Sequence, residues 1–185
     1  MYRRQRAPWP TALLILACLG SQPHAAAAGE AAFDPPVPLS RCVPLYGTSL
    51  PAALRRPGVT ARRCSVRPML RLFVLSSDPT SWPAVQTGAG QIINLEAPVA
   101  TRLWVAAAGP VGVDFREARL VVGRDARNQP RAAYYSGLAD QLDGTGSLDV
   151  FVVIRIRPRV CLLGVVPDEA AARRLAAAND SVCRS

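Results

Sequence analysis

The spacing of four cysteines constrains the fold of this chain more than any other feature. Cys42 and Cys64 are 22 residues apart, and so are Cys161 and Cys183. Oxidising compartments allow such cysteines to form disulfides, whereas the cytosol keeps them reduced. We predict two disulfides and favour the local pairs Cys42–Cys64 and Cys161–Cys183. A crossed pairing, which would tie the N-terminal segment to the C-terminal one, is the alternative.

The first 28 residues have the pattern of a secretory signal peptide. Arg3, Arg4 and Arg6 form a positive region, the apolar run Thr11–Gly20 follows, and Ala25–Ala28 supply the small residues of a cleavage site. The apolar run is about half as long as a membrane-spanning helix needs. The pattern therefore predicts a periplasmic or secreted protein, with no transmembrane segment after the signal is removed.

A lipid anchor is the alternative form of export. The run from Ile15 to Cys18 resembles a bacterial lipobox, in which Cys18 would be acylated and become the first mature residue. Leu16 fits this motif poorly, so we favour plain secretion over a lipid-anchored envelope protein.

Removal of the leader takes away the only histidine, His24, and the chain contains no lysine. Ser-His-Asp triads, Cys-His nucleophiles and histidine-containing zinc sites then cannot be assembled. Schiff-base and Walker-loop chemistry both need a lysine. If the four remaining cysteines are paired, they supply neither a thiolate nucleophile nor a zinc site. We therefore expect no cofactor and no metal, and we favour a non-catalytic protein over an enzyme.

Arginine supplies all 22 basic charges, against 13 acids, and loss of the three leader arginines lowers the formal net charge from +9 to +6. A chain without lysine that is rich in alanine, arginine and proline is typical of GC-rich coding bias. Charge alone thus gives little support for a nucleic-acid partner, which needs arginines clustered on one face.

The mature chain of about 157 residues is long enough for one domain with a hydrophobic core. Residues 29–44 form an extended, Pro-rich lead-in without helical periodicity, and residues 45–185 form a single disulfide-bonded domain.

Apolar runs that end at glycine or proline predict several strands in this domain. The clearest is Leu148–Arg157, where Val150, Val152, Ile154 and Ile156 share one face over ten residues. Further strands are predicted at Met69–Ser76, Gln91–Leu95, Thr101–Ala107, Ala118–Val122, Arg131–Ser136 and Val160–Val166. The first of these is expected to be broken by Asp78-Pro79 and Trp82-Pro83, and Gly137 is expected to end the strand that begins at Arg131.

One helix is predicted at Pro167–Asn179, where acids follow the proline in the first turn and alanines fill the body. Its small face would pack on a sheet, and Cys183 would fasten it to the strand that bears Cys161. A short helix is also expected at Pro51–Arg56. The elements predict a mainly β (α+β) fold: an antiparallel sandwich or partly open barrel with one C-terminal helix packed on the sheet and two disulfides.

Arg155, Arg157 and Arg159 form the strongest candidate binding site in the sequence. In a regular strand their guanidinium groups would share one face about 7 Å apart, a spacing suited to several anionic groups. A phosphorylated glycan, lipopolysaccharide or a partner's acidic strand would fit such a face. The alternative is a solvated outer face whose charge discourages aggregation at a sheet edge.

Five carboxylates in the middle of the chain allow a second chemistry, because glycan hydrolysis needs only two. They are Asp114, Glu117, Asp140, Asp143 and Asp149. The alternative is that they are solvated and face nearby arginines. The stretch Asp140–Asp149 fits a calcium loop poorly, since Leu142 lies between its acids and no glutamate follows, so we expect a plain connection there.

The sequence thus predicts an exported bacterial module of the cell envelope that is non-catalytic and acts in binding, assembly or inhibition. Its partner would be an envelope protein or an anionic glycan or lipid, and nucleic acid is disfavoured. The alternative function is a carboxylate-dependent cell-wall glycan hydrolase.

Overall fold

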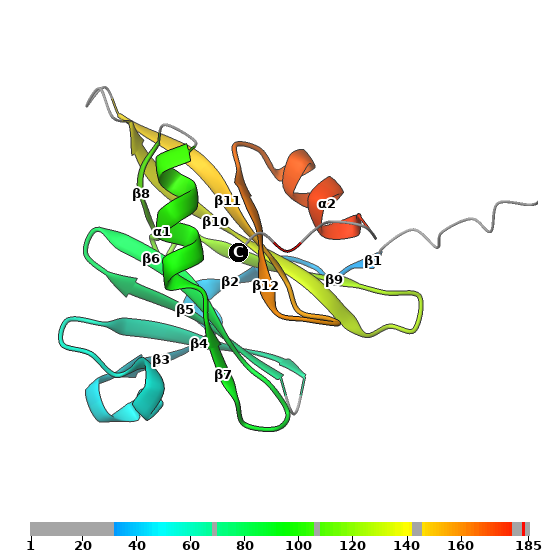
Figure 1. Cartoon of the computed structure of the whole chain (residues 1–185), viewed down its shortest axis with the longest axis horizontal. Helices are drawn as coiled ribbons and strands as arrows, with labels where there is room; N and C mark the ends of the chain where they lie inside the picture. Colours follow the sequence, from blue (N-terminus) through cyan, green and yellow to red (C-terminus); the bar gives the residue numbers. More distant parts are fainter. Residues whose placement is uncertain (1–31, 68–69, 106–107, 142–145, 179–182, 184–185) are drawn as a thin grey trace, which may run out of the picture.

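Two antiparallel sheets pack around one hydrophobic core (Figure 1). The computed structural model describes residues 32–67, 70–105, 108–141, 146–178 and 183. The predicted mainly β fold with a C-terminal helix is confirmed, as are the local disulfides Cys42–Cys64 and Cys161–Cys183. The sheets form an open sandwich and do not close into a barrel. The predicted signal peptide and the lipobox at Cys18 lie outside the described residues, within which no helix is long and apolar enough to cross a membrane.

The larger sheet has seven strands in the order β1-β9-β10-β11-β12, with β2 paired to β9 and β8 paired to β10. The strands are β1 Ala32–Phe33, β2 Val37–Pro38, β8 Ala108–Gly112, β9 Arg119–Arg124, β10 Pro130–Gln141, β11 Ser147–Arg155 and β12 Cys161–Val166. In β11 the predicted face of Val150, Val152 and Ile154 lies in the core. Val153 on the opposite face is buried too, because a helix covers that side of the sheet.

The smaller sheet has five strands in the order β3-β4-β5-β6-β7. They are β3 Val43–Tyr46, β4 Thr60–Arg67, β5 Leu70–Ser77, β6 Thr80–Gln86 and β7 Ile92–Asn94. Three short 3-10 turns accompany them, namely η1 Leu39–Arg41, η2 Gly47–Ser49 and η3 Ala52–Leu54. The last of these lies where we expected a short helix.

The predicted strand Thr101–Ala107 is wrong, because residues 101–105 belong to helix α1, Glu96–Val105. The side chain of Asn94 accepts a hydrogen bond from the backbone N–H of Glu96 and so begins the helix. A short apolar run fits a strand and a buried helix equally well, and this start signal distinguishes them. Helix α1 contacts β6 of the smaller sheet and β8 and β12 of the larger one.

Two predicted strand ends are also wrong. Trp82-Pro83 lies inside β6. Strand β7 pairs with β6 only from Ala84 to Gln86, so the missing N–H of Pro83 removes no hydrogen bond between these two strands. Gly137 lies inside the twelve-residue strand β10. A Cβ at this position would lie 2.8 Å from the carbonyl oxygen of Gly112, so glycine here allows β8 to approach β10 closely.

The Pro-rich segment from residue 32 to residue 46 connects the two sheets. Strands β1 and β2 pair with β9 in the larger sheet, and after η1 the chain enters β3, which pairs with β4 in the smaller sheet. The Cys42–Cys64 disulfide fixes the crossing to β4. Strands β1, β2 and β3 give this segment an extended course, which the 3-10 turn η1 interrupts.

Helix α2, Glu169–Ala177, covers the face of the larger sheet that points away from the main core. The side chain of Asp168 accepts a hydrogen bond from the backbone N–H of Ala171 and begins the helix. The Cys161–Cys183 disulfide fastens the chain beyond the helix to β12, as predicted.

Beneath α2 the buried Tyr134 ring makes edge contacts with Phe33 and Phe151 at centroid distances of 6.2 and 6.1 Å. Its hydroxyl donates a hydrogen bond of 2.8 Å to Glu169, which also binds Arg173. Burial first, and then the bond to Glu169, raise the pKa of Tyr134. The hydrogen bonds from Tyr134 and then Arg173 lower the pKa of Glu169.

Replacing Glu169 with glutamine is expected to reduce stability at neutral pH and to have little effect in acid. Because the folded-state pKa of Glu169 is lowered, its stabilisation is complete above the unfolded pKa and is lost as the pH falls through the folded value. Its side chain is 47% exposed, so we expect a loss of no more than about 1 kcal/mol. Urea denaturation at neutral and acid pH measures the difference, with Glu117→Gln as control. A Glu169→Gln effect independent of pH would contradict this assignment.

Candidate functional site

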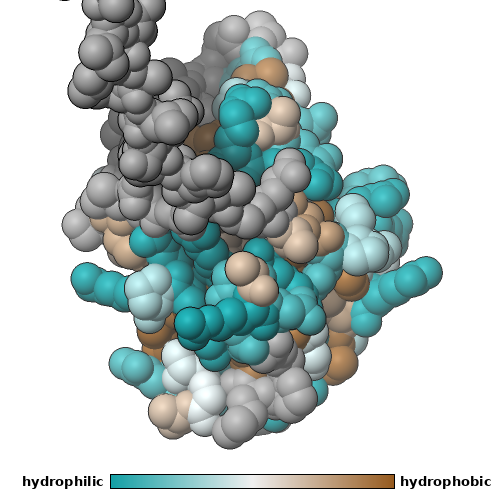
Figure 2. Space-filling model, turned by 90° about the vertical axis from the view of Figure 1, so that its right-hand side faces the viewer, coloured by the Kyte–Doolittle hydropathy of each residue, from teal (hydrophilic) through white to brown (hydrophobic). Residues whose placement is uncertain are grey.

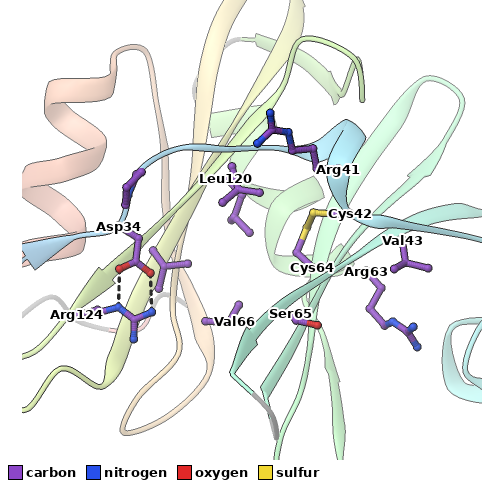
Figure 3. A pocket seen from close by; sticks show the side chains of 13 residues that line it. Asp34, Arg41, Cys42, Val43, Arg63, Cys64, Ser65, Val66, Leu120 and Arg124 are labelled. Atoms are coloured by element: carbon purple, nitrogen blue, oxygen red, sulfur yellow. Dashed lines mark hydrogen bonds and ion pairs between the residues drawn. A yellow bond between two sulfur atoms is a disulfide. The ribbon is translucent and has the colours of Figure 1, made fainter.

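A groove of about 350 Å³ lies where the chain crosses from the larger to the smaller sheet (Figure 3). Its apolar lining comes from both sheets. The larger sheet and its β1–β2 edge contribute Pro35, Val37, Leu120 and Val122, and the smaller sheet contributes Val43, Val66 and the Cys42–Cys64 disulfide. The volume lies at the lower end of the range typical of small-ligand sites.

One end of the groove is closed by an ion pair between Asp34 and Arg124. Two guanidinium nitrogens of Arg124 each donate a hydrogen bond of 2.6 Å to a different oxygen of Asp34. These bonds raise the pKa of Arg124 above its ordinary value. Such a bidentate pair fixes both side chains and joins the β1–β2 segment to β9. The Asp34 charge is thereby neutralised within the site.

The opposite wall is held by the disulfide, which joins η1 and β3 to β4 (Figure 3). Both of its cysteines are buried. Beside it, the Arg62 guanidinium donates a hydrogen bond to the Cys42 carbonyl and lies 5.5 Å from the centre of the Phe115 ring. The covalent link and the hydrogen bond hold η1 and β3 against β4 and so fix this wall of the groove.

Two further arginines line the groove. Arg41 is exposed at the end of η1, and Arg63 is half-buried on β4. Figure 3 shows Arg63 directed away from the Asp34–Arg124 pair, so the guanidinium groups do not converge on one point. In the described part of the chain, neither has an ion-pair partner. The groove therefore has apolar walls and a net charge of two positive units.

Exposed apolar side chains adjoin this groove. Val37 is 42% exposed and Val43 is 48% exposed, and they stand on opposite walls. By contrast, the side of the molecule that bears α2 and the β9–β10 turn is mostly hydrophilic among its described residues (Figure 2). Isolated apolar residues on a surface are ordinary, but two that line the same groove favour a docking surface.

The predicted arginine series does not form one regular face. Strand β11 ends at Arg155, and Arg157 and Arg159 lie in the bend that follows. The backbone N–H groups of Ile156 and Arg157 both donate to the carbonyl of Arg131, which turns the chain out of the strand. The condition for a shared face, a regular strand through Arg159, is therefore not met.

Arg157 instead lines a wide, shallow hollow together with Asp125, Arg131 and Pro158. Hydrogen bonds from the backbone of Gln129 are the main cause of the lowered pKa of Asp125, and the Arg157 charge contributes. An acid thus already stands beside this arginine. Anion binding by Arg155, Arg157 and Arg159 stays a prediction.

Three of the five candidate carboxylates meet in a second hollow of about 330 Å³. Asp114 and Glu117 come from the loop between β8 and β9, and Asp149 comes from β11. Because β8 and β9 both pair with β10, the loop between them bulges over Leu138 and brings its acids to the sheet. An oxygen of Asp114 accepts the Arg116 N–H at 2.8 Å.

The other two carboxylates lie elsewhere. Asp140 accepts a hydrogen bond from Ser147, and Asp143 lies outside the described residues, as do positions 142, 144 and 145 of the calcium-loop candidate. Among the residues that the structure describes, no three carboxylate, cysteine or histidine side chains are grouped as metal ligands.

Sequence reasoning missed the groove arginines, although a signal was present. The chain from Pro35 to Ser77 contains seven arginines and no acid. All seven arginines lie after β2, in the part of the run that forms η1 and the smaller-sheet strands. Comparison with protein-family models, with curated proteins and with solved structures finds no match for this chain.

Proposed function

We propose that this protein is a non-catalytic binding or assembly module of the bacterial cell envelope, and that the groove between its sheets receives a partner. The observation that carries the proposal is the groove itself. It combines apolar walls, two arginines that have no acid partner among the described residues, and a wall fixed by Cys42–Cys64.

The groove chemistry favours binding over catalysis. Its carboxylate, Asp34, gives both oxygens to Arg124, and its cysteines are joined to each other. The remaining ionised groups are guanidiniums, which bind anions but do not exchange protons near neutral pH. A site of this kind holds a partner and does not transfer protons.

Two disulfides are compatible with an extracellular or periplasmic location. With the signal pattern of the first 28 residues they support export to the periplasm or beyond it. A lipid anchor at Cys18 is the alternative within the same proposal.

Charge reversal of Arg41→Glu and Arg63→Glu together is expected to reduce partner binding at least tenfold. Like charges facing a complementary partner cost several kcal/mol, and about 1.4 kcal/mol corresponds to one factor of ten. The oxidised protein is immobilised and exposed to a periplasmic extract of its source, and the bound envelope components are quantified by mass spectrometry. Arg127→Glu, at an exposed position in the β9–β10 turn outside the groove, is the matched control.

Equal recovery of the same components by the wild type and by the Arg41→Glu/Arg63→Glu variant would exclude the groove as the binding site. A glycan hydrolase is the second candidate, because Asp114, Glu117 and Asp149 line one hollow. Release of peptidoglycan fragments by the wild type, lost in Asp149→Asn, would favour that candidate and contradict a non-catalytic role.

A further inference from the structure

The charge distribution around the groove identifies the chemistry of its partner. The run from Pro35 to Ser77 has seven arginines and no acid, and all seven arginines lie after β2, in the part that forms η1 and the smaller-sheet strands β3, β4 and β5. Among its described side chains, Arg56 pairs with Glu96, which comes from α1. Arg55 donates to the backbone carbonyls of Thr48 and Leu50, and Arg62 donates to that of Cys42. The wall formed by this run therefore retains a net positive charge.

The backbone at the groove edges offers little for strand addition. Pro44 has no N–H, and the N–H and carbonyl of Tyr46 are both bonded to the Ser49 hydroxyl at 2.7 Å. Across the groove, the β1–β2 edge contains Pro35, Pro36 and Pro38. Prolines at edges block pairing with a further strand. A ligand must therefore be recognised through side chains and not as an added β-strand.

We infer that the groove binds a protein segment in which an apolar side chain is flanked by carboxylates. This inference rests on the proposed binding function. The apolar side chain contacts Val37 and Val43 on the two walls, and the carboxylates bind Arg41 and Arg63. Because these guanidinium groups do not point at one another, two separate carboxylates fit them better than one. Guanidinium groups bind carboxylates with two parallel hydrogen bonds.

The same features disfavour other polyanions. Nucleic-acid sites combine a row of phosphate contacts with stacked aromatic rings. Among the large apolar side chains of the described region, the exposed aromatic one is Tyr46, and it is not part of the groove lining. An acidic polysaccharide offers no apolar side chain for the valines. Only a ligand that is partly apolar and partly acidic can contact the apolar walls and bind the arginines at the same time.

The test uses arrays of capped hexapeptides with a central valine, leucine, isoleucine or phenylalanine, flanked by glutamate, glutamine or lysine. Fluorescence anisotropy with the oxidised protein then gives affinities for the strongest peptide and for its glutamine and lysine counterparts. We expect the glutamate peptide to bind at least tenfold more tightly than its glutamine counterpart. Arg41→Gln/Arg63→Gln should remove this preference, and Val37→Ser/Val43→Ser should weaken both peptides alike. Arg127→Gln, at an exposed position in the β9–β10 turn outside the groove, is the control and should behave as the wild type.

Equal affinity for the glutamate and glutamine peptides, or binding of neither, would overturn the inference. Tighter binding of a single-stranded oligonucleotide, of heparin or of phosphatidylglycerol vesicles than of any peptide would also overturn it. These failures are distinguishable from failure of the proposed function. If Arg41→Glu/Arg63→Glu loses its envelope partner while no acidic peptide binds, the groove is a binding site for a different chemistry.

Discussion

Removing the Cys42–Cys64 disulfide with Cys42→Ala/Cys64→Ala is expected to lower the free energy of unfolding by about 3 kcal/mol. It is also expected to abolish groove binding. The bridge closes a loop with a sequence separation of 22 and so limits the conformational entropy of the unfolded chain. In the folded state it holds the wall formed by η1 and β3 against β4. Both consequences follow from one covalent bond.

The second disulfide supplies a matched control, because Cys161 and Cys183 have the same sequence separation of 22. Cys161→Ala/Cys183→Ala should lose a similar stability, since the entropic effect depends on loop length. It should keep groove binding, because this bridge lies beneath α2. Urea denaturation followed by circular dichroism gives the stabilities, and peptide anisotropy gives the binding. Groove binding retained without Cys42–Cys64 would show that the wall does not depend on the bridge.

The substitution Gly137→Ala is expected to destabilise the protein by about 1–3 kcal/mol or more. The added Cβ would lie 2.8 Å from the Gly112 carbonyl oxygen and 2.8 Å from a methyl of Val111. The carbonyl belongs to the backbone of β8, so the clash is relieved only if β8 moves away from β10. This movement would also disturb the loop after β8, which carries Asp114 and Glu117.

Gly164→Ala is the comparison that isolates the backbone clash. There the new Cβ would lie 3.2 Å from a methyl of Leu175, at the end of a flexible side chain on α2. A small rotation of Leu175 relieves this contact, so we expect a cost below about 1 kcal/mol. Thermal unfolding of both variants measures the contrast. A Gly137→Ala variant as stable as Gly164→Ala would mean that β8 is not held tightly against β10.

The parts of the fold that were predicted correctly are those with local signals. Alternation over ten residues revealed β11, and an acid-rich start followed by alanines revealed α2. The local disulfides joined elements that lie close in sequence. Helix α1 was missed because the spacing of its apolar residues fits the period of a β-strand as well as that of an α-helix. Strand β4 was missed because Arg62, Arg63 and Cys64 interrupt its apolar pattern.

The candidate sites were harder to predict because they depend on contacts between distant segments. The regularity of Arg155, Arg157 and Arg159 was visible in the sequence, but the turn after β11 depends on the Arg131 carbonyl from another strand. Arg41 and Arg63 share a groove only because β3 pairs with β4. Residue types indicated the acids of the second hollow, while their arrangement depended on how β8 and β9 pair with β10.

The crossing of residues 32–46 between the sheets has a consequence for the order in which the groove is completed. Cys42 and Cys64 have a sequence separation of only 22, so their bridge needs no later segment. Asp34, by contrast, binds Arg124, which is 90 residues further along the chain. The wall that the bridge holds can therefore form before β9 is present, whereas the Asp34–Arg124 end of the groove cannot. Groove binding is thus acquired only when β9 joins the larger sheet.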